Sequence, residues 1–185
     1  MTPFVFHLVG PPASGKRTVG LELSRLTGAV LLDNHLFNDA VFKPYGADGL
    51  RPIPDEIHAL AARVREAGLA AARLAPPDIH QIFTSYLTNR PSGPAALQMV
   101  RDVAAVRGAI YVSAWLECDV DELARRVLLP ARLERAKIRD PQQLRETLAS
   151  SGMLAPPRDA VRIDTAALSP ADSALLILHQ TGWLF

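Results

Sequence analysis

The chain contains little cysteine, few aromatic residues and almost no net charge. Its single cysteine, Cys118, excludes an intramolecular disulfide framework and is typical of a reducing compartment, so we expect a cytoplasmic protein with this thiol buried. The formal net charge of +1 favours neither nucleic acid nor an acidic surface as the main partner. No stretch approaches the ~20 apolar residues of a membrane span, and no signal-peptide pattern opens the chain, so we expect no membrane partner.

What the chain does contain is enough apolar sequence for one core. Its 185 residues, 49% of them hydrophobic, suit a single domain over residues 1–185. Five short apolar runs, most of them closed by glycine, proline or polar residues, have the character of buried strands. These expected strands cover residues 4–9, 29–33, 80–87, 109–118 and 160–165.

Helical periodicity lies between most of these runs. The expected helical segments are one that ends at Gly28, then 57–74, 95–106, a basic region over 121–150, and one capped by Ser169. Residues 34–54 are rich in asparagine, glycine and proline, and we expect them to be irregular. The alternation of strand and helix predicts an α/β domain with a parallel five-stranded sheet flanked by helices. The order of the strands is not readable from the sequence.

The first turn between strand and helix carries the pattern G-x-x-x-x-G-K, formed by Gly10, Gly15 and Lys16. Glycines in such a turn let backbone N–H groups point inward around phosphate oxygens, and the start of the following helix adds positive potential. The lysine brings a cation to the outer phosphates. The pattern in this position therefore predicts a phosphate-binding loop.

In the common form of this loop a serine or threonine follows the lysine and binds Mg²⁺, but Arg17 stands there and the hydroxyl comes later, on Thr18. The stretch GPPASGKRT resembles the adenylate-kinase loop G-x-P-G-x-G-K-G-T, and so a P-loop kinase of the group that also includes the shikimate kinases. The resemblance implies the P-loop NTPase fold, ATP as nucleotide, and Mg²⁺ held mainly by phosphates and water, with Thr18 as the candidate protein ligand. The nucleotide-binding residues it implies are Gly10, Pro11, Pro12, Ala13, Ser14, Gly15, Lys16, Arg17 and Thr18.

Three residues are candidates for the acceptor side of a reaction. Asp33 ends the second expected strand, where α/β sheets present groups to ligands, and shikimate-kinase-like proteins carry an aspartate at this point that touches substrate or metal. His35 follows closely and can contact substrate or orient the loop. Arg90 follows the third strand, roughly where nucleotide monophosphate kinases place a substrate-binding arginine. That strand ends in Thr84 and Ser85, without the acid that often ends it in these kinases.

Seven of the twenty lysine and arginine residues lie between Arg125 and Arg145, which gives that segment a charge of about +5. A basic run is often only a solvated face, but Arg132, Arg135 and Arg139 have the spacing of one helix face. Phosphoryl transfer needs such donors because negative charge grows on the transferring oxygens. The segment also resembles the lid of these kinases, so we expect a small arginine-rich lid over about 125–150. Arg126 and Arg132 are its candidate catalytic residues, with Lys16 and Asp33 in the loop and strand.

The leading interpretation is an ATP-dependent kinase that transfers the γ-phosphoryl group to a hydroxyl or phosphate of a small-molecule acceptor. A nucleotide monophosphate kinase is one alternative. A nucleotide-binding switch or sensor without phosphotransfer is the other, and the missing acid after the third strand keeps it open. Neither the identity of the acceptor nor the oligomeric state can be read from the sequence.

Overall fold

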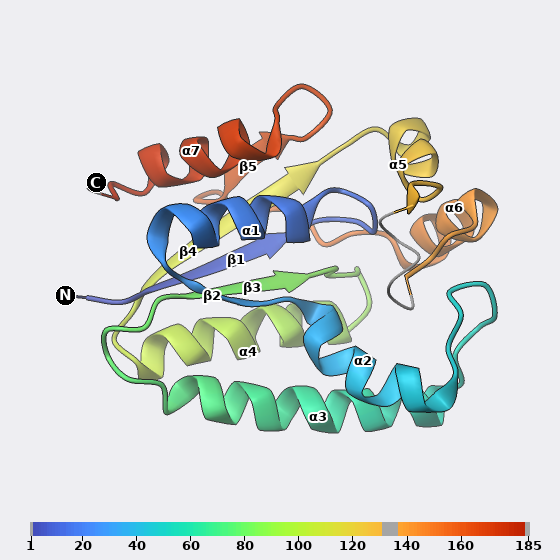
Figure 1. The fold of residues 1–185 in the computed structure, drawn as a ribbon, viewed down its shortest axis with the longest axis horizontal. Coiled ribbons are helices and arrows are strands. Elements are labelled where there is room, and N and C mark those ends of the chain that lie inside the picture. The colour runs from blue at the N-terminus through green and yellow to red at the C-terminus, as the bar shows by residue number, and fades with distance from the viewer. Residues whose placement is uncertain (1, 131–136, 184–185) are drawn as a thin grey trace.

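The computed structural model describes residues 2–130 and 137–183 of the chain. Five parallel strands form one sheet in the order β2-β3-β1-β4-β5, with helices on both faces (Figure 1). The strands are β1 (Phe4–Val9), β2 (Val30–Leu32), β3 (Gln81–Ser85), β4 (Ile110–Glu117) and β5 (Val161–Asp164). The helices in the described ranges are α1 (Lys16–Thr27), α2 (Asn34–Tyr45), α3 (Asp55–Arg73), α4 (Ser92–Val106), α5 (Val120–Arg126), α6 (Pro141–Ser151) and α7 (Pro170–Gln180).

The sheet is buried on both faces, which explains why its strands are continuous apolar runs rather than alternating ones. All six residues of β1, the central strand, are buried. On one face, Leu23 of α1 and Ile177 of α7 pack against the strands in a core cluster of buried apolar residues. On the other face, Leu69 of α3 and Val103 of α4 do the same. The α/β fold with five parallel strands between helices is therefore confirmed.

The expectation of an irregular segment over 34–54 was wrong in its first part, because α2 occupies Asn34–Tyr45. Two buried aromatic residues, Phe37 and Phe42, give this helix an inner face. Phe37 lies so close to Gly68 of α3 that a Cβ atom added there would stand 2.1 Å from the phenylalanine ring. Packing against α3 thus stabilises a helix whose composition does not favour it, and Pro44 falls in its last turn, where the helix ends.

The expected basic helical region over 121–150 is two separate helices, α5 and α6. Each begins with an aspartate cap, because the side chain of Asp119 accepts from the N–H of Asp121 and that of Asp140 accepts from the N–H of Gln142. Their buried leucines Leu123 and Leu144 share one small core cluster. Cys118 packs partly buried against that cluster, and its burial raises the pKa of the thiol.

Candidate functional site

The phosphate-binding pattern lies at the carboxyl end of β1, in the loop that leads into α1 (Figure 1). Gly10 opens the loop by donating its N–H to the carbonyl of Ser85 at the end of β3, over 3.1 Å. A Cβ atom at Gly10 would stand 2.7 Å from the carbonyl oxygen of Leu116 and 2.6 Å from the hydroxyl of Ser14. Only glycine fits this close approach, so the sheet itself fixes where the loop begins.

The middle of the loop is bent into a tight turn by left-handed backbone conformations. Ala13 has φ 68° and Gly15 has φ 85°, and between them the N–H of Ser14 donates to the carbonyl of Pro11 over 3.2 Å. A left-handed conformation is costly for alanine, and such strain gathers at functional sites. Helix α1 starts at Lys16, directly after this turn, so the positive end of a twelve-residue helix faces the loop.

Two polar groups of the loop are arranged as an anion would require. The Nζ of Lys16 lies over the loop and donates to the carbonyls of Gly10 and Pro11, at 2.7 Å each. The hydroxyl of Ser14 is buried and has no hydrogen-bond partner in the described parts of the chain. A buried hydroxyl without a partner is unfavourable, and a phosphate oxygen would satisfy it. The residues present therefore fit a nucleotide phosphate.

Arg17 and Thr18 extend from the first turn of α1. Arg17 is partly exposed and its Nε lies 3.3 Å from Oδ2 of Asp33, so it links the loop helix to the end of β2. Thr18 is exposed. The predicted nucleotide-binding residues 10–18 thus form one continuous feature, and the arginine that replaces the usual hydroxyl residue has a structural partner of its own.

Asp33 is held firmly at the carboxyl edge of the sheet. Its side chain is mostly buried, and its Oδ1 accepts a hydrogen bond of 2.8 Å from the hydroxyl of Thr84 on β3. The same hydroxyl accepts from the N–H of Asn34 over 3.0 Å. Thr84 lies near the end of β3, where related kinases often carry an acid. Its hydroxyl therefore orients Asp33 from this neighbouring strand. No local pattern indicates this pair, because its two residues lie 51 positions apart in the chain.

His35 lies on α2, one turn before Asp39, and its Nδ1 is 3.2 Å from the Oδ1 of that residue. Burial is the largest influence on His35 and lowers the pKa of its ring; the charge of Lys137 adds to this, while Asp33 and Asp39 oppose it. His35 is thus neutral around pH 7 and lies within electrostatic reach of both Asp33 and the segment that returns from the predicted lid. The contact of His35 with substrate stays a prediction.

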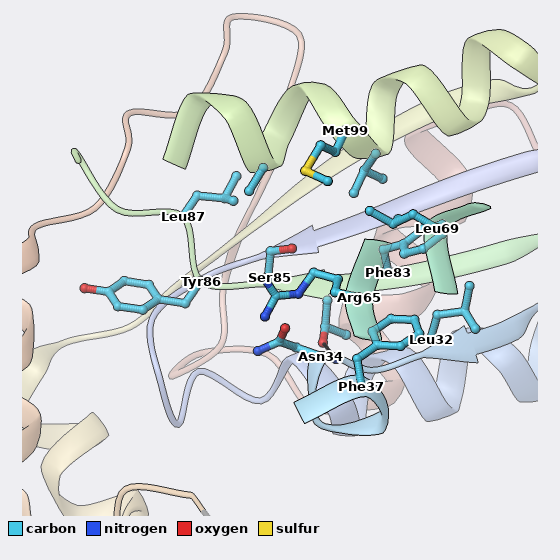
Figure 2. Close-up of a pocket in the computed structure, with 13 residues that line it drawn as sticks. Leu32, Asn34, Phe37, Arg65, Leu69, Phe83, Ser85, Tyr86, Leu87 and Met99 are labelled. Carbon is cyan, nitrogen blue, oxygen red and sulfur yellow. Dashed lines mark hydrogen bonds between the residues drawn. The ribbon is translucent and has the colours of Figure 1, made fainter. Parts of the chain in front are cut away.

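A pocket of about 130 Å³ lies beside Asp33, between α2, α3, α4 and the end of β3 (Figure 2). Its polar lining comes from Asn34, Arg65, Thr84, Ser85 and Tyr86. Its apolar lining consists of Leu32, Phe37, Leu69, Phe83, Leu87, Ala96, Met99 and Val100. Arg90, predicted to bind substrate, is exposed and is not among these residues. Arg65 was missed, because nothing in the spacing of α3 distinguishes it from a solvated arginine.

Ser85, in the position of the missing strand-three acid, belongs to a second polar network that was not predicted. Its hydroxyl is 2.9 Å from Nε2 of His7, and Nδ1 of His7 is 3.0 Å from the hydroxyl of Tyr111. His7 is fully buried in the central strand, and burial, assisted by the charge of Arg101, lowers its pKa to about 3. A neutral histidine thus fixes Ser85 at the edge of the pocket.

The predicted lid is described only in part. Arg126, at the end of α5, donates to Oε1 of Glu122 over 2.7 Å and to the carbonyl of Thr165 over 2.6 Å, so it faces the loop between β5 and α7. Arg132 and Arg135 lie outside the described residues. Arg139 lies in a stretch without helical structure, so the expected shared face does not extend to it.

Arg139 instead joins the return from the lid to the loop that follows α2. Its guanidinium donates to the carbonyl of Asp48 over 2.7 Å, and its N–H donates to the carbonyl of Gly49 over 3.3 Å. The return from the predicted lid is therefore in direct contact with the loop that follows α2.

No helix in the described ranges is both long and apolar enough to cross a membrane. Those ranges also contain no group of three or more histidine, cysteine, aspartate or glutamate side chains that could hold a metal ion.

Comparison with known proteins gives matches in structure but not in sequence. No protein-family model matches the chain, and neither does any curated protein. A gluconokinase from Sinorhizobium meliloti matches with 17% identity and a TM-score of 0.63, over 97% of this chain and 92% of that one. The APS kinase of Mycobacterium tuberculosis in complex with AMPPNP and APS matches with 16% identity and a TM-score of 0.60, over 98% of each chain. The shikimate kinase of Acinetobacter baumannii in complex with shikimate matches with 22% identity and a TM-score of 0.55, over 96% of this chain and 92% of that one. The chain therefore has the P-loop kinase fold that these enzymes share.

Proposed function

We propose that this protein is an ATP-dependent kinase that transfers the γ-phosphoryl group to a hydroxyl of a small-molecule acceptor. The observation that carries the proposal is the 3.3 Å contact between Arg17 and Asp33. It places a loop that fits phosphates next to a buried, oriented carboxylate at the same edge of the sheet. A phosphoryl donor on one side and an acceptor hydroxyl on the other would meet there.

Lys16, Ser14 and the start of α1 would hold the phosphates of the nucleotide. When bound, ATP supplies the transferable phosphoryl group, and Mg²⁺ neutralises charge on its oxygens. Lys16 would exchange its two loop carbonyls for phosphate oxygens, and the buried hydroxyl of Ser14 would gain the partner that it lacks in the described residues. We propose Thr18 as the protein ligand of Mg²⁺, because it is the first hydroxyl residue after Lys16 in the sequence.

Asp33 would orient the acceptor and accept its proton. The acceptor oxygen forms a bond to the γ-phosphorus, the bond between that phosphorus and the leaving oxygen of ADP breaks, and the hydroxyl proton passes to Asp33. His35 and Arg90 complete the predicted acceptor side. Arg126 and Arg132 are proposed to meet the charge of the transferring group, with Arg126 starting from its bonds to Glu122 and Thr165.

A nucleotide-binding sensor without phosphotransfer is the second candidate, and one observation favours it. At the end of β3, where related kinases often carry an acid, Ser85 is bound to the buried neutral His7. A protein that binds nucleotide without that acid can act as a sensor through a conformational change alone, without phosphoryl transfer. Turnover of ATP against a panel of acceptors separates the two functions.

Nucleotide binding is tested by titration calorimetry with Mg·ATP and with Mg·GTP. We expect heat of binding with at least one of them, and a Lys16→Ala variant should bind more weakly by at least about tenfold, because a charged contact to phosphate is worth roughly 1.5–3 kcal/mol. Arg25→Ala removes a cation from the exposed far end of α1 and serves as the control. Absence of heat with both nucleotides at millimolar concentration would contradict the proposal.

A further inference from the structure

Ser85 lies between the two halves of the proposed site. The strand order β2-β3-β1 places the end of β3 between Asp33, which follows β2, and the phosphate loop, which follows β1. The carbonyl of Ser85 accepts from the N–H of Gly10 over 3.1 Å, and the neighbouring Thr84 donates to Asp33. A phosphoryl group that moves from the loop to an acceptor at Asp33 therefore passes the end of β3.

The hydroxyl of Ser85 is held by a histidine that no ligand can reach. Ser85 lines the pocket beside Asp33 (Figure 2), and its Oγ lies 2.9 Å from Nε2 of His7. The other ring nitrogen of His7, Nδ1, is 3.0 Å from the hydroxyl of Tyr111. His7 is fully buried and neutral, so its ring carries one N–H and one lone pair. One of these two hydroxyls must therefore donate to the ring, and the other must accept from it.

The surroundings of Tyr111 decide which hydroxyl donates. The guanidinium of Arg101, which has only donors, lies 5.5 Å from the centroid of the Tyr111 ring. Ser113 accepts from the indole N–H of Trp115 over 2.8 Å, so its own hydroxyl hydrogen is left to donate. Burial is the largest influence on Tyr111 and raises the pKa of its hydroxyl, while hydrogen bonds from Ser113 and Arg101 to the phenol oxygen lower it. Because its oxygen accepts from these donors, Tyr111 gives its own hydrogen to Nδ1 of His7.

The direction of this chain of hydrogen bonds determines what Ser85 can do. Because Nδ1 of His7 accepts from Tyr111, Nε2 carries the ring hydrogen and donates it to Oγ of Ser85. The hydroxyl hydrogen of Ser85 is then left to donate into the pocket. An ionised acid, which related kinases often carry at the end of this strand, would offer only acceptor oxygens. Ser85 therefore has the opposite polarity and suits an electron-rich oxygen of the ligand.

We propose that Ser85 donates a hydrogen bond to an oxygen of the transferring phosphoryl group, and that His7 and Tyr111 are positioning residues that fix this direction. The inference rests on the proposed kinase function. Ser85 keeps its own proton throughout, because the acceptor oxygen bonds to the γ-phosphorus, ADP leaves with the electrons of the broken bond, and Asp33 takes the proton of the acceptor. The donor is oriented before the reaction begins, so it meets the charge of the transferring oxygens without rearrangement.

The tautomer of His7 is the first test, because it can be read in the protein without any ligand. Two-dimensional ¹⁵N–¹H NMR of histidine-labelled protein distinguishes a ring that carries its hydrogen on Nε2 from one that carries it on Nδ1. The chain has five histidines, and the signals of His7 are those missing from the His7→Gln variant. We expect the hydrogen of His7 on Nε2 at pH 7. A hydrogen on Nδ1 would make Ser85 a donor to His7 and would overturn the inference.

Binding of a phosphoryl mimic is the second test, and it needs no acceptor molecule. Mg·ADP with aluminium fluoride imitates the nucleotide together with the transferring group, and Mg·ADP alone imitates the nucleotide without it. In calorimetry, Ser85→Ala should weaken binding of the fluoride complex by about tenfold or more and change that of Mg·ADP by less than about threefold, because one hydrogen bond to a charged group is lost. Ser85→Thr keeps the hydroxyl and should retain most of the affinity. Ser92→Ala, an exposed serine at the start of α4, is the matched control.

Two further positions of the experiment test polarity and positioning. Ser85→Asp offers acceptor oxygens to the site and should weaken the fluoride complex at least as much as Ser85→Ala, so tighter binding by this variant would contradict the inference. His7→Leu removes the N–H behind Ser85 and should lower the affinity for the fluoride complex, whereas His7→Gln, whose amide can donate to Ser85, should retain most of it. Thermal unfolding shows which variants are folded. If His7→Leu is not, the wild-type tautomer and the Ser85 variants still decide.

The same measurements distinguish this inference from the proposed function. If aluminium fluoride adds no affinity to Mg·ADP in the wild type, phosphoryl transfer is refuted, and the role of Ser85 in it is refuted as well, whatever the tautomer of His7. If the fluoride complex forms and Ser85→Ala binds it as tightly as the wild type does, Ser85 does not contact the transferring group, and the kinase function stands without it.

Discussion

At the scale of single residues, Arg17 shows how the loop departs from the usual pattern without losing its geometry. A hydroxyl in this position would serve the metal, whereas the arginine reaches the carboxylate of Asp33 at 3.3 Å. The motif thus loses a hydroxyl on the metal side and gains a charged link between the loop helix and the end of β2. Asp33 is thereby contacted from two directions, by Arg17 of α1 and by Thr84 of β3.

Asp33→Asn tests the assignment of Asp33 to the acceptor side. The amide keeps the shape and can still accept from Thr84, but it cannot take a proton, so kcat should fall by about a hundredfold or more while the dissociation constant of ATP changes little. Steady-state kinetics with calorimetry of the nucleotide measure both quantities. Asp55→Asn, at the exposed start of α3, is the matched control. A variant that keeps the wild-type kcat would show that Asp33 is structural.

Residues of the site were predictable where their signal is local. Gly10, Gly15 and Lys16 lie within one turn of chain, so their spacing alone indicated the loop that the structure contains. Arg65 and Ser85 have no such signal, because only the tertiary fold brings α3 and the end of β3 to the same pocket. Arg90 was expected from its approximate position in the chain, and it is exposed and outside the pocket lining.

At the scale of elements, tertiary packing decided the two places where the sequence was misleading. In the predicted helical segment 57–74, the apolar residues Leu60 and Leu74 are 45% and 85% exposed, and α3 packs instead through Ala61, Leu69 and Ala72. Small residues let α3 approach α2, as the contact of Gly68 with Phe37 shows. The packing of α2 on α3 thus stabilises a helix that was not predicted, and the same two helices provide walls of the pocket beside Asp33.

The lid is the element whose role remains a prediction. Arg132→Ala should lower kcat by on the order of a thousandfold, because an arginine that meets the transferring group encounters its full charge only in the transition state. The dissociation constant of the nucleotide should change by less than about tenfold. Steady-state kinetics measure kcat, and titration with Mg·ATP measures the dissociation constant of the nucleotide.

Arg145→Ala is the control within the same segment. Arg145 donates to Oδ1 of Asp121 over 2.6 Å in an exposed pair between α6 and α5, and such pairs contribute little to stability. Its loss should therefore leave kcat nearly unchanged. If the two alanine variants behave alike, residues 125–150 are a solvated basic surface rather than a lid.

At the scale of the whole molecule, the alternation of strands and helices was sufficient to predict the fold class. Parallel strands buried on both faces leave a strong apolar signal, and all five were located to within a few residues. The strand order could not be predicted, because it depends on which crossovers pass over which face of the sheet. That order places β1 and β3 side by side, and so brings Ser85 against Gly10 and His7.

His7 makes the stability of this sheet depend on pH. Its pKa is about 3 in the folded protein, against an ordinary 6.5, because it is buried in the central strand and faces the charge of Arg101. At pH values between about 3 and 6.5, His7 is protonated in the unfolded chain but stays neutral in the folded protein. The contribution of His7 is therefore complete above pH 6.5 and is lost as the pH falls toward 3, by up to about 1.4 kcal/mol per pH unit.

Urea unfolding followed by tryptophan fluorescence between pH 7.5 and 4 measures this dependence, since Trp115 is fully buried in β4. The carboxylates of the protein also titrate in the lower part of that range, so the wild type must be compared with His7→Gln, which retains hydrogen-bonding groups but cannot be protonated. The variant should be less stable at pH 7, because its bonds to Ser85 and Tyr111 are altered. Its free energy of unfolding should nevertheless fall less steeply below pH 6.5, so the two curves should converge. Parallel curves would mean that His7 accepts its proton in the folded state, and that Ser85 is then held by a cation at the edge of the pocket.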